Sequence, residues 1–212
     1  PTVDLIPASY FYKNAEAKEA GLQGEYYLNS KFEGTPVFSR TDATINFHWI
    51  DKAPHTSLDE ENCSVIWKGY LKAPATGEGI LDIRGSSQYE LLIDGKSLFK
   101  FSSEHGAEHK YTKFNFEKDK LYKIEIKFAS FGANGLIKLN WQLPGNDFKK
   151  DALKIASQAD VVVMCMGLSP RIEGEEMPIK LDGFSGGDRT ALKLPDVQEN
   201  LIKAIVALGQ SL

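Results

Sequence analysis

The sequence predicts a mainly β protein, in which a β-sandwich or barrel precedes a partial α/β segment. Between Gly21 and Leu143, short aromatic and β-branched runs alternate with turn signals, as they do in all-β folds. After Pro144-Gly145-Asn146 the pattern changes to helix–strand–loop–helix, which is part of a doubly wound α/β domain. We therefore expect three parts: a leading segment 1–20, a β domain 21–143 and an α/β part 144–212.

Eight runs carry the strand signal of the β domain. Within Leu121–Phe128 the even-numbered residues are all apolar and the odd-numbered ones mostly charged, which is typical of a half-buried antiparallel strand. Asp94-Gly95, followed by Lys96–Phe99, predicts a tight hairpin because both turn residues accept positive φ. The eight predicted strands are Gly24–Tyr27, Ile45–Trp49, Ser64–Leu71, Gly79–Arg84, Tyr89–Ile93, Lys113–Phe116, Leu121–Phe128 and Leu136–Gln142.

The α/β part is predicted to hold two helices and one strand. Residues Asp147–Gln158 read as an amphipathic helix, and the apolar run Val161–Gly167 predicts a fully buried parallel strand. Pro195 opens a second helix that Gly209 ends, and its apolar face consists of Val197, Leu201, Ile205 and Leu208. One strand is not a sheet, so we expect the other strands to come from chain outside these residues.

Composition narrows the function classes. A net charge of −4 argues against nucleic acid or an anionic membrane as partner, and no apolar run approaches the roughly 20 residues needed to span a bilayer. The chain opens at Pro1, so we expect a removed leader or an excerpt from a longer protein. Cys63 and Cys165 are not expected to form a disulfide, and we expect neither a metal nor a cofactor.

An acidic loop follows the predicted buried strand. It begins at Ser169 and carries Glu173, Glu175 and Glu176. Open α/β sheets bind ligands beyond the carboxyl ends of their strands, so acids in this position indicate an active-site loop. The alternative interpretation is a solvated loop edge.

A glycine-rich stretch with an acid and a base comes after that loop. Asp188 and Arg189 are expected to pair and brace the loop, with a contact from Arg189 to substrate as the alternative. Residues Gly183–Gly187 precede a helix, but they lack the ending of a P-loop and the spacing of a dinucleotide fingerprint. We therefore exclude nucleotide binding.

Both parts of the chain resemble known families. The β part resembles the PA14 module in Gly21–Tyr27, Trp67–Leu71 and Leu91–Lys96. The α/β part is similar to the C-terminal α/β sandwich of family 3 glycoside hydrolases in Gly167–Met177, Gly187–Arg189 and Leu194–Leu201. PA14 modules inserted into that sandwich occur in β-glucosidases and β-xylosidases of this family. The resemblance makes 1–20 the tail of the host domain and 144–212 its continuation.

The resemblance also implies catalytic roles. Retaining glycosidases use two carboxyl groups about 5–5.5 Å apart, a nucleophile and a general acid/base. In this family the nucleophile is an Asp on a TIM barrel, which is missing here, so the fragment alone is expected to be inactive. The acid/base is a Glu on the acidic loop, which corresponds to Glu173, with Glu175 as the alternative. Arg171 and Arg189 are the candidates for substrate binding.

Sugar binding by the β domain is a separate question. Some PA14 relatives hold calcium through paired aspartates, but the corresponding stretch Gly85–Tyr89 has no acid, which argues against a calcium-dependent lectin site. Polar and aromatic loops could contact sugar instead, with ordinary structure as the alternative. The candidates are His48–Trp49, Ser102–His105 and Ser130–Asn134, whereas Trp67 and Trp141 are expected in the core.

Three functions compete at this point. The first is a piece of a secreted or periplasmic β-glycosidase, acting on β-linked oligosaccharides together with the missing barrel. In that case the PA14 module shapes substrate access or binds carbohydrate. The second is a non-catalytic carbohydrate-binding or adhesion module, and the third is a structural module that helps a larger protein dimerise. Exposed apolar helix faces predict that the fragment self-associates.

Overall fold

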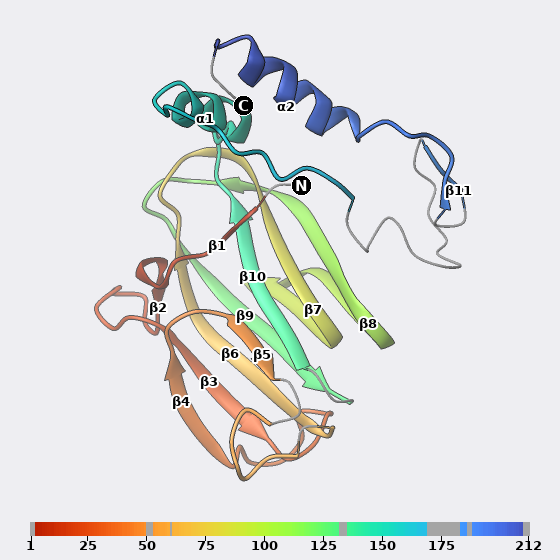
Figure 1. Cartoon of the computed structure of the whole chain (residues 1–212). Coiled ribbons are helices and arrows are strands. Elements are labelled where there is room, and N and C mark those ends of the chain that lie inside the picture. Colours follow the sequence, from red (N-terminus) through yellow and green to blue (C-terminus); the bar gives the residue numbers. More distant parts are fainter. Residues whose placement is uncertain are drawn as a thin grey trace. The chain divides into compact units, whose positions relative to one another are not determined.

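The computed structural model describes residues 3–49, 53–59, 61–131, 135–168, 183–185 and 188–209. The chain forms two compact units, residues 1–146 and 147–212, each described below by itself. The first unit is built from strands, and the second contains two helices and a short hairpin (Figure 1). The prediction of a mainly β protein with a short helical C-terminal part is confirmed.

One curled antiparallel sheet makes up the first unit. Its strands lie in the order β1-β10-β7-β9-β6-β3-β4, while β2 pairs with β6, β5 with β10 and β8 with β7. The elements of this unit are β1 (Asp4–Leu5), the 3-10 helix η1 (Ala8–Tyr10), β2 (Phe11–Tyr12), β3 (Leu22–Tyr27), β4 (Phe38–Asp42), β5 (Asn46–Trp49), β6 (Cys63–Lys72), β7 (Gly77–Ile93), β8 (Lys96–Phe116), β9 (Leu121–Ser130) and β10 (Gly135–Gln142).

The hairpin of β7 and β8 is longer than the sequence predicts. Asp94 and Gly95 turn it with φ values of 51° and 78°, as predicted. Strand β7 continues through a register shift between Ser86 and Gln88, so that its first half pairs with β10 and its second half with β9. Such a bulge bends a strand, and the bend curls the sheet. The expected loop at 102–105 is therefore wrong, and residues 85–88, which separate two predicted strands, also lie inside a strand.

The core lies between the facing sides of this curled sheet. The predicted alternation in β9 is confirmed, because Tyr122, Ile124, Ile126 and Phe128 are all buried. Trp67 and Trp141 are buried, as predicted for core residues. Strands β1, β2 and β4 had no predicted counterpart.

The second unit contains α1 (Phe148–Ala156), β11 (Phe184–Ser185), β12 (Asp188–Arg189) and α2 (Asp196–Val206). Both helices match their predicted positions. The Asp147 carboxylate accepts a 3.0 Å hydrogen bond from the backbone N–H of Lys150 and so caps α1. Gly209 ends the turn after α2 with φ of 72°. Within the described part of the chain, neither helix has the length and apolar character to cross a membrane.

The buried parallel strand predicted at Val161–Gly167 is wrong. Apart from a single β-bridge residue at Val161, no strand forms there, side chains alternate between half-buried and exposed, and Val163 is 85% exposed. Cys165 is exposed, not buried as expected. A parallel strand needs hydrogen-bonded neighbours, and the described residues of this unit supply none beyond the short β11–β12 hairpin. The apolar run has the composition of a buried strand, but the described residues of this unit form no sheet that would bury it.

Candidate functional site

The predicted acidic loop lies outside the described residues. Glu173, Glu175 and Arg171 all fall within 169–182. The structure describes the chain on both sides of that loop, at Gly167–Leu168 and from Gly183 onward. These two flanks hold the ends of the acidic loop, and their contacts define the described part of the candidate site.

The first flank is held by a side-chain amide. Gln198 on α2 donates from Nε2 to the carbonyl oxygen of Gly167 at 2.7 Å, and its Oε1 accepts from the Gly167 N–H at 3.0 Å. The amide group therefore makes the pair of hydrogen bonds that a neighbouring strand would make with this residue. It fixes Gly167 relative to α2, two residues before the acidic loop begins.

The second flank is the hairpin of β11 and β12. Phe184 pairs with Arg189, and Ser185 pairs with Asp188. The backbone N–H of Thr190 donates to the carbonyl oxygen of Gly183 at 2.8 Å, and Gly183 adopts φ of 85°. A residue with a Cβ is strained at that φ, so glycine suits the point where the chain enters the hairpin.

The predicted ion pair between Asp188 and Arg189 is absent. Consecutive residues of a strand point to opposite faces, so their side chains diverge. Arg189 instead donates from Nη2 to the carbonyl oxygen of Lys193 at 3.1 Å, and the Lys193 ammonium group lies 3.1 Å from the Asp196 carboxylate. Arg189 thus braces the connection from β12 to α2 while remaining exposed.

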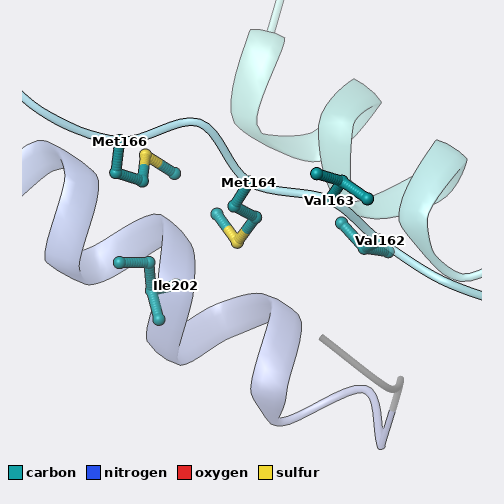
Figure 2. Close-up of a pocket in the computed structure, with 5 residues that line it drawn as sticks. All are labelled: Val162, Val163, Met164, Met166 and Ile202. Atoms are coloured by element: carbon teal, nitrogen blue, oxygen red, sulfur yellow. The ribbon is translucent and has the colours of Figure 1, made fainter.

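An apolar groove accompanies these flanks in the second unit. Its lining residues are Val162, Val163, Met164 and Met166 of the connecting segment and Ile202 of α2, and Figure 2 shows Met164 and Met166 on the part of that segment drawn next to Ile202. A neighbouring part of the groove is lined by α1 residues, including Ile155 and Ala156. No charged side chain is among the described residues that line the groove, which combine the apolar run Val161–Met166 with apolar side chains of α1 and α2.

In the first unit, a buried carboxylate joins three strands. Asp42 on β4 accepts hydrogen bonds at Oδ2 from the Tyr26 hydroxyl (2.6 Å) and the Trp67 indole N–H (2.7 Å), and at Oδ1 from Arg40 Nε (2.8 Å). Burial raises the pKa of Tyr26 well above its usual value, and the Asp42 hydrogen bond adds to the rise. Both oxygens of the Asp42 carboxylate accept hydrogen bonds from these side chains, so we assign the network a structural role.

A second buried acid lies on the opposite face of the sheet. Asp82 on β7 is fully buried and accepts a 2.7 Å hydrogen bond from the Asn140 amide on β10. Nδ1 of His109, on β8, lies 3.2 Å from the other carboxylate oxygen. Sequence reasoning missed this cluster, because its members are far apart along the chain and only the sheet register brings them together.

Two of the predicted sugar-contacting stretches approach each other at Gly135, where a Cβ would lie 3.2 Å from the Trp49 ring and 3.6 Å from Ser130 Oγ. His48–Trp49 belongs to β5, where Trp49 is buried and packs 5.7 Å from Phe128, centroid to centroid. Ser130 is buried at the end of β9, and residues 132–134 lie outside the described residues. Within the described ranges, no three His, Cys, Asp or Glu residues gather as metal ligands would.

Comparison with known proteins matches most of this chain to one family. The sequence model of the PA14 domain matches residues 18–153. A xylan 1,4-beta-xylosidase of Xylanibacter ruminicola is 29% identical over 196 residues, which cover 90% of this chain and 22% of that protein. The chain thus spans about a fifth of the length of the curated relative that it matches.

Solved structures share the fold. Selenomethionine-labelled β-glucosidase from Kluyveromyces marxianus superposes with a TM-score of 0.65 at 19% identity, covering 98% of this chain and 26% of that one. The same enzyme in complex with glucose gives 0.61 at 17% identity, with 98% and 25% covered. An epithelial adhesin A domain from Candida glabrata in complex with β-lactose gives 0.51 at 10% identity, with 66% and 88% covered. At these identities the likeness concerns the fold alone.

Proposed function

This chain belongs to the PA14 domain family, and from that premise we propose that it is part of a retaining β-glycosidase of family 3 type. The proposed parent removes terminal β-linked sugars from oligosaccharides, as a β-xylosidase or β-glucosidase. One observation carries the proposal: the match to the xylosidase runs through 90% of the chain and so includes both units. A free-standing sugar-binding module would need only the first unit to match.

Glu173 is our proposed general acid/base, with Glu175 as the alternative. The role comes from the resemblance of the acidic loop to the family pattern. The described flanks support it, because Gln198 holds one side of the loop and the β11–β12 hairpin forms the other. A proton donor must be positioned to within a fraction of an ångström, which requires a loop with anchored ends.

The nucleophile is proposed to come from a barrel domain outside this chain. Retaining hydrolysis needs two carboxyl groups on either side of the scissile bond, so the 212-residue chain alone is proposed to be inactive. Arg171 and Arg189 are the proposed substrate contacts. Arg189 has one hydrogen bond to Lys193 and an exposed side chain, so its guanidinium retains donors for a ligand.

The PA14 unit is proposed to shape access to the pocket or to bind part of the oligosaccharide. The Candida glabrata adhesin domain, which is solved with β-lactose, has the same fold. That likeness supports sugar binding as a role that this fold can serve. A secreted or periplasmic location follows for an enzyme that acts on oligosaccharides outside the cell, and we propose it on that ground.

The test uses the complete parent enzyme. Hydrolysis of a panel of aryl β-glycosides is compared for the wild type and Glu173→Ala, with and without azide, and with Glu176→Ala as a neighbouring control. If Glu173 is the acid/base, activity falls most on substrates with poor leaving groups, and azide restores part of it on activated ones. Full activity in Glu173→Ala, with loss in Glu175→Ala, moves the role to Glu175. Full activity in both variants overturns the proposal and favours a binding module.

A further inference from the structure

Three basic side chains lie in one row on the outer face of the first unit. His109 on β8, Arg84 on β7 and Lys138 on β10 are directly opposite one another in the sheet register. Directly opposite residues project from the same face of a sheet. This face is the one away from the core, because the adjacent residues Ile83 and Leu139 are the ones buried in the core.

Two basic side chains of this row repel each other electrostatically. Like charges directly opposite each other in a sheet are destabilising, and Arg84 and Lys138 are such a pair. Neither makes an ion pair with any described residue, although both are half-buried. The Nε of Arg84 is buried without an acceptor, the single such side-chain atom in the described part of the chain. An unmade hydrogen bond of that kind costs about 1–3 kcal/mol, so an absent acceptor is the natural explanation.

The nearest acid does not supply that acceptor. Asp82, two residues before Arg84 on the same face, is fully buried between His109 and Asn140. Its two oxygens are directed to those neighbouring strands, at 3.2 Å and 2.7 Å. Asp82 therefore positions His109 and Asn140, and it does not serve as the hydrogen-bond acceptor for the Arg84 guanidinium.

An aromatic ring lies next to the basic row. Tyr111 is opposite Asp82 in the register, and it is 55% exposed. Diagonal neighbours in a sheet are about 7–8 Å apart, so the Tyr111 ring and the Arg84 guanidinium can reach the two ends of one hexose. The C–H face of a pyranose is apolar and packs on such a ring, while its substituent extends toward the row.

We propose that this face binds a sugar acid, with its carboxylate on Arg84 and Lys138 and its ring on Tyr111. The planar guanidinium fork matches a carboxylate in bidentate geometry, and a turn of the Arg84 side chain would bring its buried Nε to the acceptor that it lacks. Lys138 adds a second positive charge on the neighbouring strand. The ligand class is a uronic acid or a uronic-acid side group on an oligosaccharide. The site is separate from the acidic loop and is independent of the catalytic role proposed for Glu173.

The first test is a titration of the 212-residue chain with D-glucuronate, D-glucose and acetate, followed by ¹⁵N chemical shifts that include the Arg84 Nε–Hε group. Glucuronate is expected to shift Arg84 strongly. Acetate should bind about tenfold more weakly, equivalent to about 1.4 kcal/mol, because it lacks the ring that contacts Tyr111. Glucose should leave Arg84 unmoved. Equal binding of acetate and glucuronate, or no shift with either, overturns the proposal.

Variants separate binding from folding. Arg84→Met and Lys138→Met keep the aliphatic stems and should weaken glucuronate binding at least tenfold, while Lys123→Met on β9, an exposed position, should not. Arg84→Met should also raise or preserve the Tm, because it removes a repulsion and an orphaned donor. A lower Tm in Arg84→Met, together with unchanged binding, would assign Arg84 a structural role and overturn the site.

Discussion

The indole N–H of Trp67 donates a 2.7 Å hydrogen bond to the carboxylate of Asp42, and both residues are buried. The two strands that carry them are not neighbours, since β3 lies between β4 and β6. Gly24 on β3 leaves the space that the contact needs, because a Cβ there would lie 2.7 Å from Oδ2 of Asp42. A charged side chain therefore ties three strands together inside an aromatic core.

Removing the charge of Asp42 is expected to destabilise the first unit. Asp42→Asn replaces one acceptor oxygen with a donor, which then faces the buried donors of Tyr26 and Trp67 or the half-buried donor of Arg40. We expect a loss of about 2–4 kcal/mol in the free energy of unfolding. Urea denaturation measures it. Asp119→Asn, at a 65%-exposed carboxylate paired with Lys72, is the control and should cost less than about 1 kcal/mol. Equal effects of the two substitutions would show that the network contributes nothing special.

The Cys63 thiol predicts a loss of stability in alkali. Burial raises its pKa from the ordinary 9.0 to about 11, and the nearby charge of Asp59 contributes. The unfolded chain therefore loses this proton at lower pH than the folded chain. Its contribution to stability is complete below pH 9 and is lost as the pH rises to about 11, with a slope of at most about 1.4 kcal/mol per pH unit.

Denaturation midpoints between pH 8 and 11 measure this contribution. Cys63→Ala should flatten the decline. Cys165→Ala should leave it unchanged, because Cys165 is exposed. The same difference predicts that a thiol reagent modifies Cys165 in the native chain and Cys63 only after unfolding. Rapid modification of both cysteines in native buffer would contradict the burial of Cys63.

Loss of the Gln198 amide should release Gly167. In Gln198→Ala the two hydrogen bonds to the Gly167 backbone disappear. Since one such bond is worth about 1 kcal/mol net, exchange of the Gly167 amide hydrogen should accelerate about fivefold. Asn200→Ala, an exposed position on the same helix, is the matched control. If the Gly167 amide hydrogen exchanges at the same rate in the two variants, Gln198 does not hold the backbone of Gly167 in place.

The exposed apolar side chains of the second unit predict that the isolated 212-residue chain self-associates. Val163 and Val197 are 85% and 79% exposed. Burying such apolar side chains against a second copy of the chain removes them from water and is favourable. Val163→Lys or Val197→Lys should shift the chain toward monomer in sedimentation velocity. Val37→Lys, at a 41%-exposed position in the first unit, should not. A clean monomer for the unsubstituted chain would sink the prediction.

The sequence predicted correctly those elements that depend on residues close together in the chain. The alternation of β9, the Asp94-Gly95 turn and the Asp147 cap each depend on residues within a few positions of one another. Strand β4 was missed because its sequence, Phe38–Asp42, is mostly polar. Its inward carboxylate is acceptable only because Tyr26 and Trp67 supply donors from other strands.

Two predictions were wrong for the same reason, because a local pattern does not show whether partner strands are present. The run Val161–Gly167 has the apolar character of a buried strand, but periodicity cannot say whether neighbouring strands are present. Conversely, Ser86 and Ser102 read as loop residues, although partner strands hold them in β7 and β8. For the candidate site, the proposal of Glu173 rests on the family resemblance, and this residue lies outside the described ranges. The Gln198 contact and the Arg84 row depend on pairings across 31 and 54 positions of sequence, which no local pattern encodes.

The pairing of β1 with β10 sets how the first unit can be joined to another domain. Asp4 lies opposite Trp141 and Leu5 opposite Asn140, so the chain enters and leaves this unit through adjacent antiparallel strands. For a host domain, a unit joined in this way is equivalent to one short loop, because its two ends already lie side by side. The entropy cost of bringing the two ends of the insertion together is therefore small. The unit can thus be transplanted into a surface loop of an unrelated scaffold with little strain at the junction.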